Sequence, residues 1–240
     1  MTTNKFTTEQ LLLTGQSSDH IAWLNEHIGI HQQMLSAWQH MQHDAKNAGF
    51  DLQIASGFRS FERQVTIWNN KYSGKIPVKD RNNISINLIQ LSEIERIKAI
   101  LVFSALPGAS RHHWGTDIDI YDPNLLSSDQ TLQLEAWEYQ QGGAFYPLSL
   151  WLSKYCSNYG FYFPYNIDRG GVTIEPWHLS YAPLSYTYQQ QFSLALLNTV
   201  ISNSDILAKA CLLKNCSNIY KNFIMNINYP STELLEKNFE

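Results

Sequence analysis

The sequence predicts an α+β fold in which a small, mostly antiparallel sheet is flanked by helices. Segments with helical and with strand periodicity are interspersed, without the regular strand–helix alternation that builds a parallel sheet. The 240 residues, 44% of them hydrophobic, are enough to bury one sizeable core. We therefore predict a single domain over residues 1–240, with a motif-bearing core at about 50–182 and a helical C-terminal extension at about 185–240.

Two helices are predicted in the first fifty residues. Thr7-Thr8-Glu9-Gln10 resembles a capping box, and Gly15 marks the end of the short helix that this box begins. A second helix runs up to Gly49, because apolar side chains recur before it at helical spacing: Met34, Trp38, Met41 and Ala45. This stripe is typical of a core-facing surface rather than of a cofactor site.

A short strand leads into a polar segment and a third helix. Leu52 and Ile54 alternate with polar neighbours, which predicts a strand that ends at the segment 56–60. Ser60 is a candidate N-cap for the helix that follows. The buried face of that helix is predicted to carry two apolar residues, Val65 and Trp68.

The middle of the chain predicts one more helix and one more strand. After a polar, turn-rich stretch at 71–87, helical spacing returns and stops at Pro107-Gly108. The apolar residues of that helix are Ile94, Ile97 and Leu101. The run 115–121 alternates and is bounded by Asp122-Pro123, which predicts a strand.

The last hundred residues predict a helix, two strands and further helices. The first of these helices ends at Gly160. Two short strands are expected on either side of a turn at 168–171, namely 161–163 and 172–174. From Ser185 onward the pattern is helical. Two residues are candidate caps there, Asp205 and Ser217.

Composition argues against several classes of protein. A net charge of −4 provides no concentrated basic field, so we expect no nucleic-acid partner and no attraction to an anionic membrane. No window approaches the roughly 18 apolar residues of a membrane span, and no signal peptide is readable at the N-terminus. Three cysteines without framework spacing argue against a disulfide-stapled domain. We expect a cytoplasmic protein, or a periplasmic or secreted one if a leader has been removed.

Two histidines and an aspartate are candidates for the ligands of one zinc ion. His112 and Asp119 lie seven residues apart, and Gly115 between them allows a tight reversal after which both side chains face one point. The third ligand should be another imidazole, and His178 is the candidate because it lies close to Glu175. Three protein ligands leave a fourth position open for water, which is typical of catalytic rather than structural zinc.

Glu175 is the candidate general base. Pro176 disfavours a helical conformation at Glu175, so Glu175 and His178 do not share a helical face as in His-Glu-x-x-His enzymes. An extended or turned segment must bring them together. There, Glu175 would take a proton from water at the metal and pass it to the leaving amine.

Arg59 supplies a positive group for the same site. Its guanidinium either pairs with a substrate carboxylate or stabilises the oxyanion of a tetrahedral intermediate. Gln64, about one helical turn further on, and Ser110 are candidates for hydrogen bonds to the same ligand. Each residue alone has an ordinary structural explanation, and it is their conjunction that predicts a site.

Three motifs in order resemble the vancomycin-resistance-type (VanY-like) D-alanyl-D-alanine carboxypeptidases, zinc peptidases grouped with lysostaphin and the hedgehog signalling domain. The family pattern Ser-x-His-x-x-Gly-x-Ala-x-Asp matches Ser110, His112, Gly115 and Asp119. The pattern Glu-x-Trp-His matches Glu175, Trp177 and His178. A Ser-Gly-Tyr-Arg-Ser segment is similar to residues 56–60, and Gln64 falls at the family's glutamine. The resemblance covers roughly residues 56–181.

The resemblance implies a zinc-dependent carboxypeptidase that removes the C-terminal D-alanine from a peptidoglycan stem peptide or a similar peptide. It implies three ligands for one zinc ion: His112, Asp119 and His178. It implies Glu175 as the catalytic base, with Arg59 assisting catalysis. It implies four residues that contact the substrate: Arg59, Gln64, Ser110 and Trp177.

One residue departs from the family pattern. The family usually has a small apolar residue where this chain has Asp117, which by strand alternation points to the same side as Asp119. Asp117 would compete as a ligand, orient a histidine or contact the substrate. The sequence leaves these three roles open.

The remaining histidines and cysteines have ordinary explanations. Two pairs are expected to be surface or capping residues: His27 with His31, and His40 with His43. Cys211 and Cys216 lack a partner pair and are expected to be small packing residues. His113 cannot share the orientation of His112 if the segment is extended, so it is left unassigned or in a supporting role.

Other activities fit the same site. A D,D-dipeptidase or a murein endopeptidase would use the same zinc and Glu175 in a cleft of different shape. A non-catalytic, zinc-stabilised binding module would use the fold without hydrolysis, although the presence of Glu175 argues against it. The choice between D,D and L,D bonds and the oligomeric state are left open by the sequence.

Overall fold

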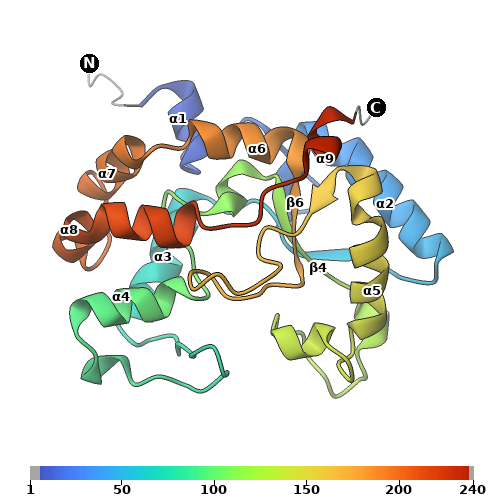
Figure 1. Cartoon of the computed structure of the whole chain (residues 1–240), viewed down its shortest axis with the longest axis horizontal. Helices are drawn as coiled ribbons and strands as arrows, with labels where there is room; N and C mark the ends of the chain where they lie inside the picture. The colour runs from blue at the N-terminus through green and yellow to red at the C-terminus, as the bar shows by residue number, and fades with distance from the viewer. Residues whose placement is uncertain (1–5, 238–240) are drawn as a thin grey trace.

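The computed structural model describes residues 6–237 and places a four-stranded antiparallel sheet at its centre (Figure 1). The strand order is β3-β4-β6-β5, so β4 and β6 are the inner pair. Their bounds are Gln53–Ser56 for β3, Asp117–Tyr121 for β4, Phe161–Tyr162 for β5 and His178–Tyr181 for β6. A separate hairpin pairs β1 (Ile21–Trp23) with β2 (Gly29–His31). The prediction of an α+β fold with a small antiparallel sheet is confirmed.

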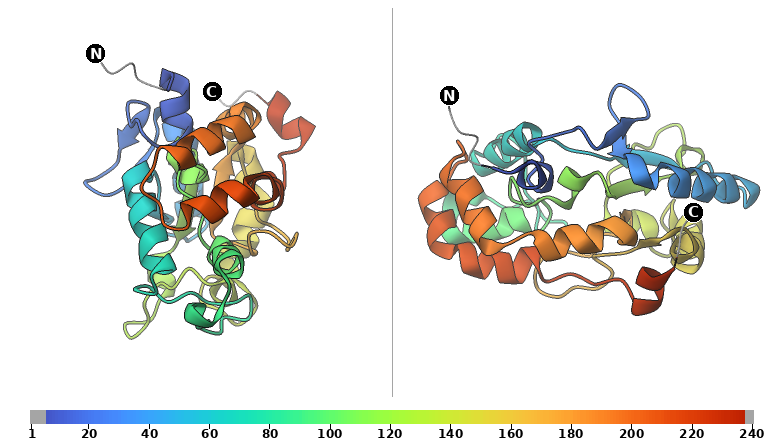
Figure 2. Two further views of the ribbon diagram at one scale, coloured as in Figure 1. Left: turned by 90° about the vertical axis from the view of Figure 1, so that its left-hand side faces the viewer. Right: turned by 90° about the horizontal axis from the view of Figure 1, so that it is seen from above.

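Helices flank this sheet. Their bounds are α1 Thr8–Leu13, α2 Leu35–Asn47, α3 Phe61–Tyr72, α4 Glu93–Leu101, α5 Tyr146–Tyr155, α6 Ala182–Gln191, α7 Leu194–Ser202, α8 Lys209–Ile219 and α9 Thr232–Glu236. In Figure 1, α2 and α5 lie on one side of the sheet, and α3, α4, α7 and α8 gather on the other. Seen from above, α7 and α8 lie at the end of the molecule opposite to α2 (Figure 2). Within the part of the chain described here, no helix is long and apolar enough to span a bilayer.

Strand β4 separates apolar from polar side chains. Ile118 and Ile120 are fully buried in a hydrophobic cluster with residues of α2 and α5. Side chains alternate along a strand, so Asp117 and Asp119 point to the opposite face. The register pairs Asp119 with Ser56 of β3 on one side and with His178 of β6 on the other. The sheet therefore has one apolar face in a core and one polar face that is free to form a site.

A second hydrophobic cluster joins the chain's two ends to its middle. Trp68 of α3 and Ile97 of α4 pack in this cluster with Leu197 of α7 and Leu212 of α8. The C-terminal helices α7 and α8 thus pack directly on α3 and α4, the two helices that follow Arg59 in the chain. Cys216 is buried in the same cluster, in agreement with the prediction of a packing residue.

Several predicted helix ends are confirmed. Thr7 accepts a hydrogen bond from the backbone N–H of Gln10 and completes a capping box. Ser60 caps α3 by accepting from the backbone N–H of Arg63. Gly160 ends the helical stretch after α5 in the left-handed conformation, with φ of 84°. Serine and threonine oxygens satisfy free N–H groups at helix starts, which explains why these boundaries are readable from sequence.

Three predictions of local structure are wrong. Val172–Ile174 is a loop, because the backbone N–H of Thr173 bonds to the carbonyl of Val102 and β6 takes the place in the sheet. α4 ends at Leu101 rather than at Pro107-Gly108, since the following residues turn to line the cleft described below. α8 begins after Ala208, so Asp205 is not its cap, and Ser217 lies inside the helix.

Candidate metal centre and active-site cleft

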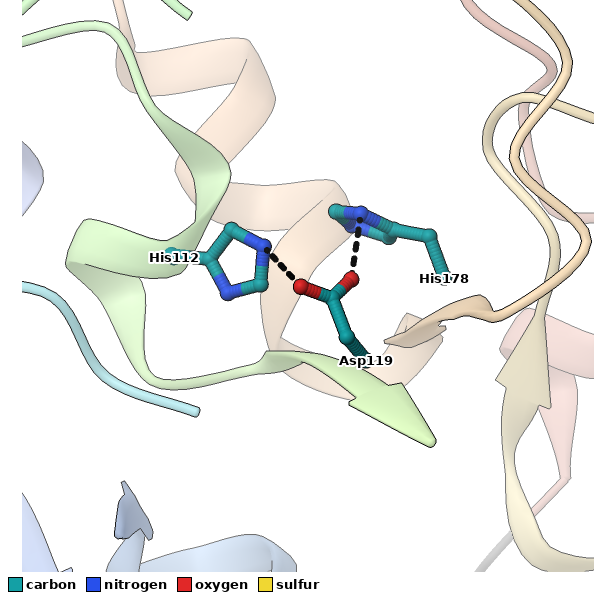
Figure 3. Close-up of side chains that lie close together, drawn as sticks. All are labelled: His112, Asp119 and His178. Atoms are coloured by element: carbon teal, nitrogen blue, oxygen red, sulfur yellow. Dashed lines mark ion pairs between the residues drawn. The ribbon is translucent and has the colours of Figure 1, made fainter. Parts of the chain in front are cut away.

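Three buried side chains from different elements converge on one point (Figure 3). His112 comes from a short 3₁₀ helix at Arg111–Trp114, Asp119 from β4 and His178 from β6. Nε2 of His112 lies 3.4 Å from Oδ2 of Asp119, and Nδ1 of His178 lies 3.3 Å from Oδ1 of the same carboxylate. One ligand atom from each residue lies within 4.8 Å of the other two. The structure brings together the three residues predicted as ligands.

Gly115 and the strand register produce this convergence. Gly115 adopts the left-handed conformation, with φ of 68°, and reverses the chain between the 3₁₀ helix and β4. A Cβ at this position would lie 2.9 Å from the backbone nitrogen of His31 and closer still to Ile21, so the turn has no room for a side chain. After the turn, the pairing of Asp119 with His178 places the second and third side chains side by side.

Hydrogen bonds on the far side of each ring fix which nitrogen faces the centre. Nδ1 of His112 lies 2.9 Å from the carbonyl oxygen of Gly57, which can only accept, so Nδ1 carries the proton and Nε2 is free. Nε2 of His178 lies 2.9 Å from Oδ1 of Asp117, which leaves Nδ1 facing Asp119. Such partners set the tautomer and orientation of metal-binding histidines.

Asp117 orients His178 from behind, one of the three roles that the sequence left open for it. The carboxylate also accepts a hydrogen bond from Nε of Arg111 at 2.7 Å. Burial opposes its ionisation, but the Arg111 guanidinium and His178 hold the pKa of Asp117 well below its usual range. Arg111 is itself buried and bonds to Gln189, Tyr162 and Ser180. Asp117 and Arg111 thus form a buried ion pair that shapes the site, and their charges are satisfied by protein groups rather than by solvent or a ligand.

The trio suits a divalent cation. Burial lowers the pKa of His112 to about 4, so its ring is neutral at pH 7, as a metal ligand must be. Burial disfavours the charged form of Asp119, but the neighbouring imidazoles keep its pKa below the ordinary value. Oδ1 of Asp119 is nevertheless buried without a hydrogen-bond donor among residues 6–237. A buried carboxylate oxygen without a donor is unfavourable, and a cation at the centre of the trio satisfies it. The residues therefore fit a zinc ion.

Glu175 lies directly beside the trio. Its Oε2 is 3.1 Å from Nδ1 of His178, and its backbone N–H donates to the carbonyl of Tyr165 at 3.1 Å. Burial would lower the pKa of His178, but the adjacent carboxylates of Asp117, Asp119 and Glu175 raise it well above its ordinary value. Positive charge is thus favoured at this point. Burial raises the pKa of Glu175 itself, which suits a carboxylate that accepts and returns a proton.

Arg59 extends from the segment after β3 into the same cleft. Its Nη1 donates to Oε1 of Gln64 and its Nη2 to the hydroxyl of Ser56, both at 3.0 Å. Gln64 is fully buried, and its Nε2 donates to the carbonyl of Ala105 at 2.6 Å. In this structure Gln64 holds Arg59 against the segment that contains Ala105. Contact of Gln64 with substrate, expected from the sequence, stays a prediction.

Ser110 and Trp177 both line the cleft. The hydroxyl oxygen of Ser110 is buried and has no hydrogen-bond partner within the described part of the chain, so it is free to bond a ligand. Trp177 is 5% exposed and packs its ring against Tyr139. His113 supports the site, because Nε2 accepts from the N–H of Gly108 and Nδ1 bonds to the carbonyl of Arg59.

The cleft has a volume of about 410 Å³ and contains residues that sequence reasoning missed. They are Lys71, Lys79, Ser104, Glu135 and Tyr165. Lys79 and Glu135, from two separate loops, form an ion pair of 2.6 Å. Lys71 lies seven residues after Gln64, two helical turns along one face of α3, and this spacing is the signal that would have found it. The other four lie in loops or turns without a readable pattern.

Fold and site together define a class of protein: a metallopeptidase with a His-Asp-His trio on the polar face of a small antiparallel sheet and a glutamate beside it. The chain belongs to the VanY family of D-alanyl-D-alanine carboxypeptidases, which residues 13–184 match. The resemblance drawn from the three motifs is thereby confirmed.

Individual relatives and solved structures are similar to large parts of the chain. Over 122 residues the chain is 40% identical to an uncharacterized protein of Haemophilus influenzae, a match that covers 50% of this chain and 93% of that one. VanYB in complex with D-alanine-D-alanine matches with a TM-score of 0.51 and 19% identity, over 79% of this chain and 92% of that chain. A vancomycin-resistance D,D-pentapeptidase VanY in complex with Zn(II) matches with a TM-score of 0.50 and 21% identity, over 76% and 91% of the two chains. At these identities the solved structures show a shared fold.

Proposed function

We propose that the protein is a zinc-dependent carboxypeptidase that removes the C-terminal D-alanine from peptidoglycan-type peptides. One zinc ion is held by His112, Asp119 and His178. The observation that carries the proposal is the carboxylate of Glu175, 3.1 Å from Nδ1 of His178, in a cleft that also contains Arg59. Membership in the VanY family supports the peptidase activity and the class of peptide.

The side chains around the trio divide the chemistry between them. When bound by these three ligands, zinc would polarise the attacked carbonyl and lower the pKa of water, which allows attack at neutral pH. Glu175 takes the proton from the attacking water and delivers it to the amine of the departing D-alanine. The pKa of Glu175, raised by burial, brings its two protonation states closer in free energy and so favours this return of the proton.

Arg59 stabilises the negative charge that develops on the attacked carbonyl oxygen. Its guanidinium is oriented by Gln64 and Ser56 before substrate arrives, so little reorganisation is needed during the reaction. Arg59 lines the cleft together with Asp119 and Glu175. Burial lowers the pKa of Arg59, while the two carboxylates act in the opposite direction.

The test compares wild type with Glu175→Gln, both with measured zinc content. D-alanine release is followed from a murein tetrapeptide, a murein pentapeptide and the dipeptide D-alanyl-D-alanine. We expect equal zinc content and a loss of roughly 100- to 10,000-fold in kcat/KM for Glu175→Gln. The preferred peptide decides between D,D and L,D specificity.

Three results would overturn the proposal. Equal release by both proteins would remove Glu175 from the mechanism. A wild type that carries one zinc ion but cleaves only D-alanyl-D-alanine or only intact murein would instead be a dipeptidase or an endopeptidase. A zinc-loaded wild type that cleaves none of these would favour a binding module.

A further inference from the structure

Two positive charges of the cleft have no partner carboxylate. The cations that line the cleft are Arg59, Lys71, Lys79 and Arg111. Lys79 pairs with Glu135 at 2.6 Å, and Arg111 with Asp117 at 2.7 Å. Within residues 6–237, neither Arg59 nor Lys71 forms an ion pair with a carboxylate. Because buried charges are normally paired, two unpaired cations in one cleft indicate a negatively charged ligand.

Lys71 belongs to the same wall of the cleft as Arg59. It lies in the last turn of α3, and its Nζ donates to the hydroxyl of Ser104 at 2.5 Å. The next residue, Ala105, accepts the hydrogen bond of Gln64, which in turn holds Arg59. One hydrogen-bonded wall therefore carries both cations. An ammonium group has three N–H donors, and the bond to Ser104 leaves two of them for a ligand.

The two cations enter the cleft from different segments, Arg59 from the loop before α3 and Lys71 from the last turn of α3. Burial and the charge of Arg59 lower the pKa of Lys71, and the charge of Glu175 acts in the opposite direction. The pKa of Arg59 responds to both Asp119 and Glu175. Arg59 is the cation beside the trio, because its backbone N–H donates to the carbonyl of His112 at 3.1 Å. Lys71 lines the same cleft from the last turn of α3, where it can meet the part of the peptide that extends beyond the attacked bond.

We propose that Lys71 binds the α-carboxylate of the leaving C-terminal residue and thereby restricts the enzyme to peptides with a free C-terminus. This inference rests on the proposed function, because it assigns one group of the same substrate to a residue of the same cleft. It divides the work of the two cations: Arg59 faces the carbonyl that is attacked, and Lys71 holds the terminal carboxylate. An internal peptide bond presents no charge at that position and leaves Lys71 unpaired.

The test uses a peptide as its free acid and as its C-terminal amide, with wild type, Lys71→Met and Lys71→Gln. Wild type should prefer the acid. Both variants should lose roughly 10- to 100-fold of that preference, the range for a hydrogen bond to a charged group, while cleavage of the amide changes little. Lys71→Gln keeps a donor for Ser104 and so serves if Lys71→Met does not fold. Lys71→Arg, which keeps the charge, should retain part of the preference.

The control is Lys75→Met, because Lys75 is exposed and does not line the cleft. It should keep the wild-type ratio of acid to amide cleavage. If Lys71→Met and Lys71→Gln lower cleavage of acid and amide equally, Lys71 is a structural residue at the end of α3 and the proposal is wrong. It is also wrong if both variants keep the full preference.

A binding measurement separates this inference from the proposed function. Calorimetry on zinc-loaded Glu175→Gln, with and without Lys71→Met, compares N-acetyl-D-alanyl-D-alanine with its amide. Tighter binding of the acid that depends on Lys71 supports the inference even if wild type releases no D-alanine. Equal affinity for acid and amide in the presence of Lys71 refutes the inference even if the protein is a carboxypeptidase.

Discussion

Replacing Asp117 by asparagine tests whether the residue behind His178 controls the metal centre. The carboxylate accepts four hydrogen bonds, from Arg111, Thr116, His178 and Ser180. Oδ1 receives the two nitrogen donors, and Oδ2 receives the two hydroxyls. Hydroxyl groups can rotate to accept from an amide, so an asparagine can keep its oxygen towards Arg111 and His178. The substitution therefore removes the charge and largely preserves the geometry.

The expected losses of stability and of zinc affinity follow from the two groups that lose a negatively charged partner in Asp117→Asn, namely Arg111 and His178. Arg111 is 4% exposed and would remain as a buried cation without a counter-ion, which costs about 3–5 kcal/mol of folding free energy. Its remaining bonds to Gln189 and Tyr162 favour the lower end of that range. Loss of the negative charge behind His178 should weaken zinc binding by roughly 10- to 100-fold.

Two assays and one control decide the matter. Urea unfolding of the metal-free protein measures stability, and competition with a chromophoric chelator measures zinc affinity. Asp122→Asn is the control, because Asp122 is 1% exposed and its carboxylate, among residues 6–237, accepts hydrogen bonds only from the backbone N–H groups of Asp51 and Asn124. It should lower stability without changing zinc affinity. Wild-type zinc affinity in Asp117→Asn would refute the assignment of Asp117 as the group that orients His178.

Two further predictions concern the turn before β4 and a buried histidine. Gly115→Ala should lose about 1–3 kcal/mol from backbone strain alone and more from the contact with His31, and should weaken zinc binding by displacing His112. Gly74→Ala is the control for backbone strain, because Gly74 has a φ of 77° and an added Cβ would meet nothing within 4 Å. Urea unfolding measures the stability of both variants, and equal losses of unfolding free energy would contradict the steric argument. Burial lowers the pKa of His31 to about 4 from 6.5, so it stabilises the fold fully above pH 6.5 and progressively less down to pH 4. In His31→Asn the free energy of unfolding should fall less steeply between pH 6.5 and pH 4, and an unchanged slope would show that His31 does not titrate as inferred.

The centre of the site was predictable because each ligand lies in a short motif. His112 and Asp119 needed no long-range information beyond the turn at Gly115, and the pairing of β4 with β6 then placed His178 beside them, with Glu175 three residues before it. The structure was needed to see Asp117 behind His178, since strand alternation gives the direction of a side chain but not its partners.

Other features were not readable because they depend on packing between distant segments. β1 and β2 have three residues each, too few to show a period. Val172–Ile174 has the composition of a strand, but the adjacent position in the sheet belongs to β6. Lys71 looks like an ordinary helix-end lysine until Ser104 and the cleft are placed beside it.

The alternation along β4 also links the stability of the fold to the geometry of the site, because both depend on the same strand register. Ile118 and Ile120 belong to a core, and the residues on either side of Ile118 belong to the site. A slip of one residue would turn two carboxylates into the hydrophobic cluster and two isoleucines into the cleft. Such a misfolded chain would be strongly destabilised, so a molecule that folds stably has its metal ligands in register. Quality control by proteases, which act on unfolded chains, thereby also removes molecules with a defective site.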